Sequence, residues 1–131
     1  MPVTYFFDEN MSESSANSIH EIRNIFGESI TTIIREFNGQ GTSDEDISNV
    51  LSQKNQKCVI VTQDDDFAKR ELFKQIMKSK NMGLFLIKFP RGSKIWRQHV
   101  FMINHWEEIA NKSINFPFAY LVKFKNKFSK I

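Results

Sequence analysis

Short apolar runs alternate along the chain with stretches in which apolar residues recur every three or four positions. Short runs of this kind are typical of buried strands, and the periodic stretches are typical of amphipathic helices. Strands are predicted at residues 3–7, 29–37, 58–61, 84–87 and 116–128. Helices are predicted at residues 16–26, 43–51, 68–77 and 96–110.

The alternation of strand and helix predicts the fold class. Strands that are apolar on both faces and separated by helices form a parallel sheet covered on both sides. With right-handed crossovers, the result is an α/β/α three-layer sandwich around a mainly parallel sheet of about five strands. We expect a single domain over residues 1–131, with a basic strand or tail from about residue 116.

Three acidic clusters fall where such a fold binds ligands. Asp8 and Glu9 follow the first predicted strand, Asp64 and Asp66 follow the third, and Asp44 opens the helix between the second and third. Ligands of open α/β sheets bind beyond the carboxyl ends of the strands, where the strand order reverses. We therefore expect the three clusters to meet at one edge, provided that the strands before Asp8 and Asp64 are neighbours.

Convergent carboxylates need a compensating charge. Two of them about 4 Å apart repel by roughly 4 kcal/mol at an effective dielectric constant near 20. Oxygen ligands without His or Cys select Mg²⁺ or Mn²⁺, and such ions suit phosphodiester hydrolysis. Each cluster alone also fits a polar turn or a helix cap, and Asp44 fits a cap best.

Composition and charge narrow the class of protein. The chain is 40% hydrophobic with 13 Phe, which is enough for a real core. It has no apolar run long enough to cross a membrane and no secretory signal pattern, so we expect a cytoplasmic protein. Residues 1–53 hold two basic and nine acidic side chains, and residues 54–131 hold 16 and six. A net charge of −7 followed by +10 suggests a phosphate-rich partner, or charges that only solvate the surface.

The acidic blocks resemble a known family. Residues 5–10, 43–47 and 59–67 are similar to the three motif blocks of PIN-like ribonucleases, most of all to the branch found in VapC-type toxins of toxin–antitoxin systems. The resemblance continues through residues 82–89 and 96–109. It implies an endoribonuclease that uses Mg²⁺ or Mn²⁺ to cleave single-stranded or structured RNA. It also implies a cognate antitoxin as partner and a possible homodimer.

The same resemblance implies roles for individual residues. Asp8, Asp44 and Asp64 match metal-binding carboxylates, and Thr62 matches a hydroxyl that orients a carboxylate. Asp66 is a further catalytic acid, which either binds the metal directly or supports a residue that does. The residues expected to support the site are Glu9, Asn10, Ser43, Glu45 and Thr62. Many members have a further glutamate before the central acid. The glutamates in the corresponding interval here match no motif, so the sequence does not decide whether the site binds one metal ion or two. They are Glu21, Glu28 and Glu36.

Basic side chains near the expected edge are candidates for RNA contact. Arg91, Lys94 and Arg97 surround the start of the last helix, and Lys123 and Lys125 alternate with apolar residues in the last strand. Each group fits RNA backbone binding. Each also has a plain alternative, which is surface charge for the first group and protection of an edge strand for the second.

Other residues with chemical potential have simpler interpretations. The three His residues lack metal-ligand spacing, and Cys58 fits a small core residue. Trp96 and Trp106 are expected in the core or on a dimer face rather than in a base-stacking platform.

The sequence therefore favours an enzyme, a metal-dependent PIN-like ribonuclease. One alternative is a receiver-like signalling domain with Asp64 as phosphoacceptor and Lys88 nearby. Against it, the acidic start of the central helix and the basic C-terminal part have no role there. The other alternative is a catalytically silent PIN-like domain that binds RNA or an antitoxin.

Overall fold

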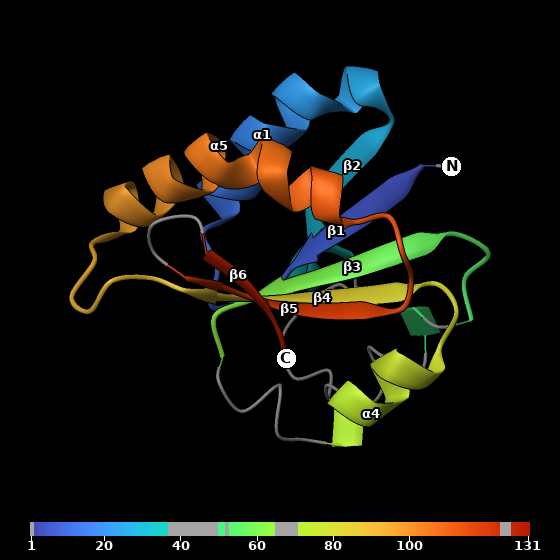
Figure 1. The fold of residues 1–131 in the computed structure, drawn as a ribbon. Coiled ribbons are helices and arrows are strands. Elements are labelled where there is room, and N and C mark those ends of the chain that lie inside the picture. Colours follow the sequence, from blue (N-terminus) through green and yellow to red (C-terminus); the bar gives the residue numbers. More distant parts are fainter. Residues whose placement is uncertain (1, 37–49, 52, 65–70, 124–126) are drawn as a thin grey trace.

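The computed structural model describes residues 2–36, 50–51, 53–64, 71–123 and 127–131 (Figure 1). Six strands form one sheet in the order β2-β1-β3-β4-β5-β6. The first five strands of that order are parallel, and β6 is antiparallel to β5. The strands are β1 (Val3–Phe7), β2 (Glu28–Thr32), β3 (Lys57–Thr62), β4 (Met82–Lys88), β5 (Phe118–Lys123) and β6 (Lys127–Lys130).

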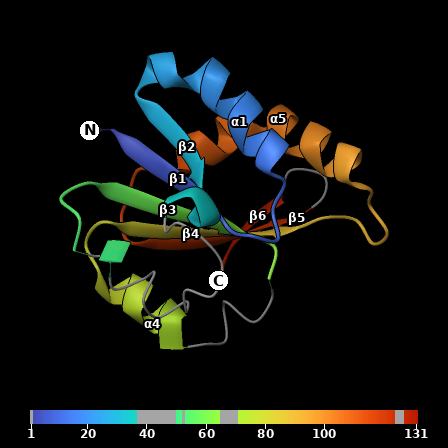
Figure 2. The same ribbon diagram turned by 180° about the vertical axis from the view of Figure 1, so that it is seen from behind.

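Helices cover both faces of this sheet. The helices are α1 (Glu13–Arg23), the 3₁₀ helix η1 (Asn24–Phe26), α2 (Ile33–Glu36), α4 (Glu71–Lys78) and α5 (Ile95–Lys112). Figures 1 and 2 show α1 and α5 side by side on one face and α4 on the other. The expected three-layer α/β/α fold with a mainly parallel sheet is confirmed. No helix in the described part of the chain is long and apolar enough to cross a membrane.

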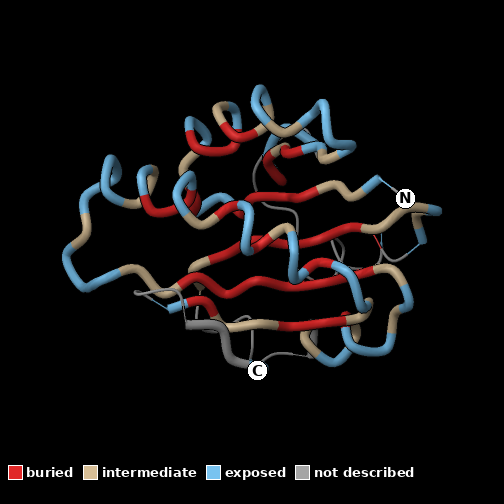
Figure 3. Tube along the Cα trace, turned by 45° about the horizontal axis from the view of Figure 1, so that its top comes forward, coloured by how far each residue is buried: buried red, intermediate tan, exposed pale blue. Residues whose placement is uncertain are grey.

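Alternation along each strand divides the core into two halves. Tyr5 and Phe7 of β1 pack toward α1 and α5, where Ile19 and Trp106 meet them. Phe6, between them in the strand, belongs to the opposite cluster, which includes Ile60, Leu84 and Ile76 of α4. Successive side chains of a strand point to opposite faces, so a run that is apolar at every position is buried from both sides. Figure 3 shows the resulting band of buried strands through the centre.

Local signals explain the first helical unit. Ser12 caps α1, because its hydroxyl oxygen accepts a hydrogen bond from the Ser15 amide at 3.3 Å. Gly27 ends η1 with φ of +80°, a left-handed conformation that glycine adopts without strain. The predicted helical segment therefore ends at residue 26, as expected.

Two predicted strands differ in the structure. Residues 33–36 form the short helix α2 instead of continuing a strand to residue 37. The Thr32 hydroxyl accepts the Arg35 amide proton at 3.1 Å, which favours a helical turn there. Residues 116–128 are not one strand either, since Lys127–Lys130 pairs antiparallel with Tyr120–Lys123. Of the predicted helix 43–51, Val50 and Leu51 are helical and residues 43–49 lie outside the described part.

The strand order reverses beside β1 and β3, and ligands of open α/β sheets bind at such a point. From β1 the chain adds β2 on one side and then β3 on the other, so the order reverses at β1. Parallel pairing aligns Phe7 with Val61, which brings the residues after both strands to the same edge. The requirement that the strands before Asp8 and Asp64 be neighbours is met.

Candidate active site

Asp8 is held at the carboxyl end of β1. Its amide donates a hydrogen bond to the Val61 carbonyl oxygen of β3 at 2.9 Å, and its own carbonyl oxygen accepts the Met11 amide proton at 2.9 Å. The residue is only 8% exposed. Its backbone is thus fixed on both sides, and its carboxylate lies at the edge where the strand order reverses.

Thr62 connects Asp8 with Asp64. This fully buried residue ends β3, and its hydroxyl lies 3.0 Å from Asp8 Oδ2, to which it donates a hydrogen bond. The same oxygen accepts the Asp64 amide proton at 3.1 Å. One hydroxyl therefore orients the first acid and fixes the backbone of the second. The role implied for Thr62 by the sequence is consistent with this geometry.

Asn10 joins the loops that follow the two strands. Its Oδ1 accepts the Gln63 amide proton at 3.4 Å and lies 3.4 Å from the Thr62 hydroxyl. Its carbonyl oxygen also accepts a hydrogen bond from the Gln63 side-chain amide. Sequence reasoning included Asn10 but missed Gln63. The only sequence signal for Gln63 is its position between Thr62 and Asp64. That signal is weak, because either an apolar or a polar side chain can occupy such a position.

The remaining predicted site residues divide into one that the structure describes and four that it does not. Glu9 is exposed and follows Asp8 directly. The other predicted residues of the site lie outside the described part of the chain; they are Ser43, Asp44, Glu45 and Asp66. The described residues alone contain no group of three His, Cys, Asp or Glu side chains arranged to hold a metal.

The donor chemistry of the described site fits a hard divalent cation. Its oxygens come from two carboxylates, Asp8 and Asp64, and from the Asn10 amide. Mg²⁺ and Mn²⁺ prefer such oxygen donors. Two of the three histidines are engaged elsewhere: His20 Nδ1 accepts the Ile30 amide proton, and His99 Nδ1 lies 2.9 Å from the Ser15 hydroxyl. Asp8, Asp64 and Asn10 are therefore the described residues that could hold such a cation.

The predicted RNA-contacting residues lie at the same sheet edge or near it. Arg91, Lys94 and Arg97 are exposed in and after the loop that follows β4, the neighbour of β3. Lys123 is exposed at the end of β5, and Lys125 lies outside the described residues. Because the strands are parallel, these loops follow carboxyl ends on the side of the sheet where Asp8 lies.

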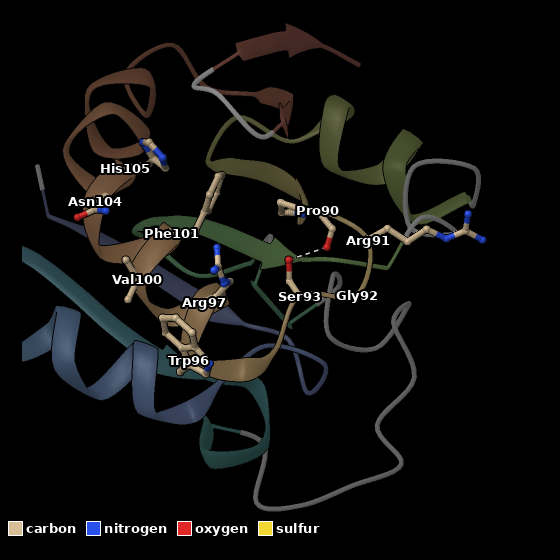
Figure 4. Close-up of a pocket in the computed structure, with 10 residues that line it drawn as sticks. All are labelled: Pro90, Arg91, Gly92, Ser93, Trp96, Arg97, Val100, Phe101, Asn104 and His105. Carbon is tan, nitrogen blue, oxygen red and sulfur yellow. Dashed lines mark hydrogen bonds between the residues drawn. The ribbon is translucent and has the colours of Figure 1, made fainter.

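A cavity of about 440 Å³ lies between the β4–α5 loop and the first half of α5 (Figure 4). Its helical lining comes from two adjacent rows of residues at i, i+4 spacing. The rows are Trp96, Val100 and Asn104, and Arg97, Phe101 and His105. Sequence reasoning missed this cavity, although the mixture of aromatic and polar residues within each row was a signal for it.

The two tryptophans have different environments. Trp106 is in the core, as expected, with its ring centroid 4.7 Å from that of Tyr5 and its Nε1–H donating to Glu28 at 2.9 Å. Trp96 is 60% exposed, so the expectation of a core residue is wrong for it, and the alternative of a dimer face stays a prediction. In Figure 1 the start of α5 extends beyond the sheet edge.

Comparison with known proteins gives one match. Residues 3–88 match the family model of the PIN-like domain, which is more than half of the chain and includes all three acidic clusters. No curated protein matches the chain, and no solved structure matches it. The PIN-like fold is generally a nuclease fold. The sheet order, the acids at its reversal point and the family match agree, and the chain belongs to the PIN-like domain family.

Proposed function

We propose that this protein is an endoribonuclease that uses Mg²⁺ or Mn²⁺ to hydrolyse RNA phosphodiester bonds at the edge formed by β1 and β3. The observation that supports this most strongly is the Asp8–Thr62–Asp64 arrangement. An aspartate that is 8% exposed occupies the ligand-binding edge of the fold. Its carboxylate is oriented by a buried hydroxyl, and a second acid follows the neighbouring strand.

Asp8 and Asp64 would hold the cation, together with Asp44 and with Asp66 as a further acid, as the sequence motifs imply. Burial makes a carboxylate costly unless a cation or a set of donors compensates it. When bound, a divalent cation neutralises the carboxylates, polarises the phosphate and activates water for attack. The chain needs no nucleophile of its own for such hydrolysis.

The remaining residues of the edge position groups and attract substrate. Thr62 holds the Asp8 carboxylate in one orientation, and Asn10 fixes the two loops against each other. Arg91, Lys94 and Arg97 provide positive charge beside the acids, where the phosphate backbone of RNA would approach. Positive charge next to a cation site favours a polyanionic substrate over a small neutral one.

We further propose that the protein is the toxin of a toxin–antitoxin pair in the cytoplasm, with an antitoxin protein as partner and a homodimer as a possible form. This assignment rests on the resemblance of residues 5–10, 43–47 and 59–67 to VapC-type toxins. The family match favours a nuclease over the receiver-like alternative.

The direct test is cleavage of a mixed, partly single-stranded RNA pool in Mn²⁺. We expect cleavage by the wild-type protein, loss of cleavage in EDTA and loss in Asp8→Asn, which keeps the size of the side chain and removes its charge. Glu21→Gln is the matched control, because Glu21 is exposed on α1 away from the sheet edge, and it should cleave like the wild type.

Each other outcome has a definite meaning. Cleavage that survives both EDTA and Asp8→Asn would refute the assignment of this site. RNA binding without cleavage, unaffected by Mn²⁺ or by loss of Asp8, would instead support a catalytically silent domain.

A further inference from the structure

The cavity beside α5 has the size and the mixed lining of a small-ligand pocket. Its volume of about 440 Å³ falls in the range of small-ligand pockets. Trp96 and Phe101 provide aromatic surface, and Asn104 and His105 provide polar groups. None of its described lining residues is acidic, and two are arginines. An aromatic, cationic pocket favours a ligand with a flat ring and negative charge.

Trp96 and Arg97 form a flat, charged platform at the mouth of the cavity. The Arg97 Cζ lies 5.1 Å from the centroid of the Trp96 ring, which is a cation–π arrangement. Trp96 is 60% exposed, a large exposure for tryptophan. Figure 4 shows Arg97 beside Trp96 and Phe101, whereas Arg91 extends away from them. Aromatic rings and arginine planes of this kind stack on unpaired bases.

His105 adds an incomplete polar environment to the same cavity. Its ring packs edge-on against Phe101 with centroids 4.5 Å apart. Its Nδ1 is buried and has no hydrogen-bond partner among the described residues. Buried polar atoms without a partner are uncommon in folded proteins, and a ligand or ordered water usually completes them.

The cavity also lies close to the acidic edge. Its loop follows the carboxyl end of β4, and β4 pairs directly with β3, which leads to Asp64. An RNA strand that reaches Asp8 and Asp64 can therefore extend along the sheet edge toward Trp96.

We propose that this cavity binds one unpaired nucleotide of the RNA substrate, with the base stacked on Trp96 and its phosphate near Arg97. Asn104 and His105 then contact the edge of the base. The choice of RNA as the ligand rests on the proposed function. It also deepens that function, because the pocket would select substrates that present an unpaired base at a set distance from the cleaved bond.

The test measures binding without cleavage. A short single-stranded RNA with a 5′ fluorophore is titrated with protein in EDTA, and affinity is read by fluorescence anisotropy. A series of oligonucleotides with one abasic position each shows which base contributes. We expect one abasic position to weaken wild-type binding by roughly tenfold, and Trp96→Ala to weaken binding of the intact RNA by a similar factor.

The combination of the two changes identifies the contact. In Trp96→Ala, the critical abasic position should cause no further loss, because the stacking partner is already absent. Trp96→Phe should retain most of the affinity. Ile95→Ala is the matched control, since Ile95 is 71% exposed next to Trp96 but does not line the cavity, and it should bind like the wild type.

Failure here is distinguishable from failure of the nuclease proposal. If Trp96→Ala binds like the wild type, or its abasic penalty persists, the nucleotide pocket is refuted, and cleavage in Mn²⁺ still tests the enzyme. If Arg97→Ala weakens binding while Trp96→Ala does not, the surface contacts only the RNA backbone and the pocket is again refuted. Base-dependent binding through Trp96 in EDTA, together with no cleavage of the same RNA in Mn²⁺, would support the pocket and refute the nuclease.

Discussion

At the scale of single residues, the buried Thr62 hydroxyl connects the two halves of the candidate site. It donates to Asp8 at 3.0 Å and accepts from the Asp64 amide at 3.1 Å, so its loss removes one hydrogen bond from the Asp8 carboxylate and one from the loop that carries Asp64. A hydrogen bond to a charged group contributes about 1.5–3 kcal/mol. Thr62 acts through Asp8 and is therefore a positioning residue.

We expect Thr62→Val to lower the rate of RNA cleavage by roughly 10- to 100-fold, because Asp8 loses its orienting donor. Thr62→Ser keeps the hydroxyl and should stay within a few-fold of the wild type. Cleavage rates as a function of Mn²⁺ concentration check this, because a positioning role predicts a higher Mn²⁺ requirement in Thr62→Val. A lower stability with an unchanged Mn²⁺ requirement would show that Thr62 is only structural.

Tyr5 links the core to the pH dependence of stability. Burial raises the pKa of its phenol to about 12, although a hydrogen bond with Ser113 lowers it in part. The folded state therefore retains a proton that the unfolded chain releases near pH 10. The stabilisation of the folded state by the protonated Tyr5 phenol is fully present below pH 10 and is lost as the pH rises toward 12.

The measurement is the free energy of unfolding in urea at pH 8, 10 and 11 for the wild type and Tyr5→Phe. At pH 11, one unit above the ordinary pKa of tyrosine, the wild type should have lost about 1.4 kcal/mol relative to Tyr5→Phe. An equal loss of unfolding free energy in both proteins would contradict the assignment of this pH dependence to Tyr5.

Residue-level predictions from the sequence succeed where strand register determines the outcome. Asp8 and Asp64 each follow a buried apolar run, so parallel pairing brings them to one edge whatever the loops do. The contacts of Gln63 depend on loop geometry, which apolar periodicity does not contain. The exposure of Trp96 was not predictable either, because an apolar residue at helical spacing has the same pattern whether or not an element covers it.

At the scale of elements, Glu28 joins β2, α1 and α5. Its carboxylate accepts hydrogen bonds from Trp106 Nε1 at 2.9 Å and from Arg23 Nε and Nη2 at 3.0 and 2.6 Å. The Arg23 and Glu28 side chains are 21% and 13% exposed. Water therefore screens the attraction between these two charges only in part. The hydrogen bond with Glu28 raises the pKa of Arg23 above its ordinary value.

We expect Glu28→Gln to lower the free energy of unfolding by about 1–3 kcal/mol, because three donors lose a charged acceptor. The control is Glu13→Gln, whose pair with Arg35 has a similar length of 2.8 Å but is exposed. That change should cost less than about 1 kcal/mol. Urea unfolding of both variants makes the comparison, and equal effects would mean that burial of the Glu28 cluster adds nothing.

Elements were predictable to the extent that their pattern is unambiguous. Runs such as Cys58–Val61 occur in the structure as buried strands, because only a strand covered on both faces places every residue in the core. The pair Ile33 and Ile34 fits both a strand and a helical turn, and the Thr32 side chain favours the turn. A period of two along residues 116–128 is equally typical of one long strand and of two paired strands.

At the scale of the whole molecule, the strand order carries the functional argument. Sequence patterns predict the alternation of elements but not their order, since only packing selects which strands become neighbours. The order β2-β1-β3 puts the reversal point between the acids that the motifs single out. The family match over residues 3–88 covers the same region, whereas the cavity on α5 lies beyond it.

The measurement that tests the central claim most directly is Mn²⁺ binding by titration calorimetry. It compares the wild type with Asp8→Asn, Asp64→Asn and the control Glu21→Gln, and it requires no knowledge of the RNA substrate. We predict that the wild type and Glu21→Gln bind Mn²⁺ alike and that each aspartate variant binds at least about tenfold more weakly, a loss of about 1.4 kcal/mol. Equal Mn²⁺ affinity in all four proteins would contradict the assignment of a metal site to this edge.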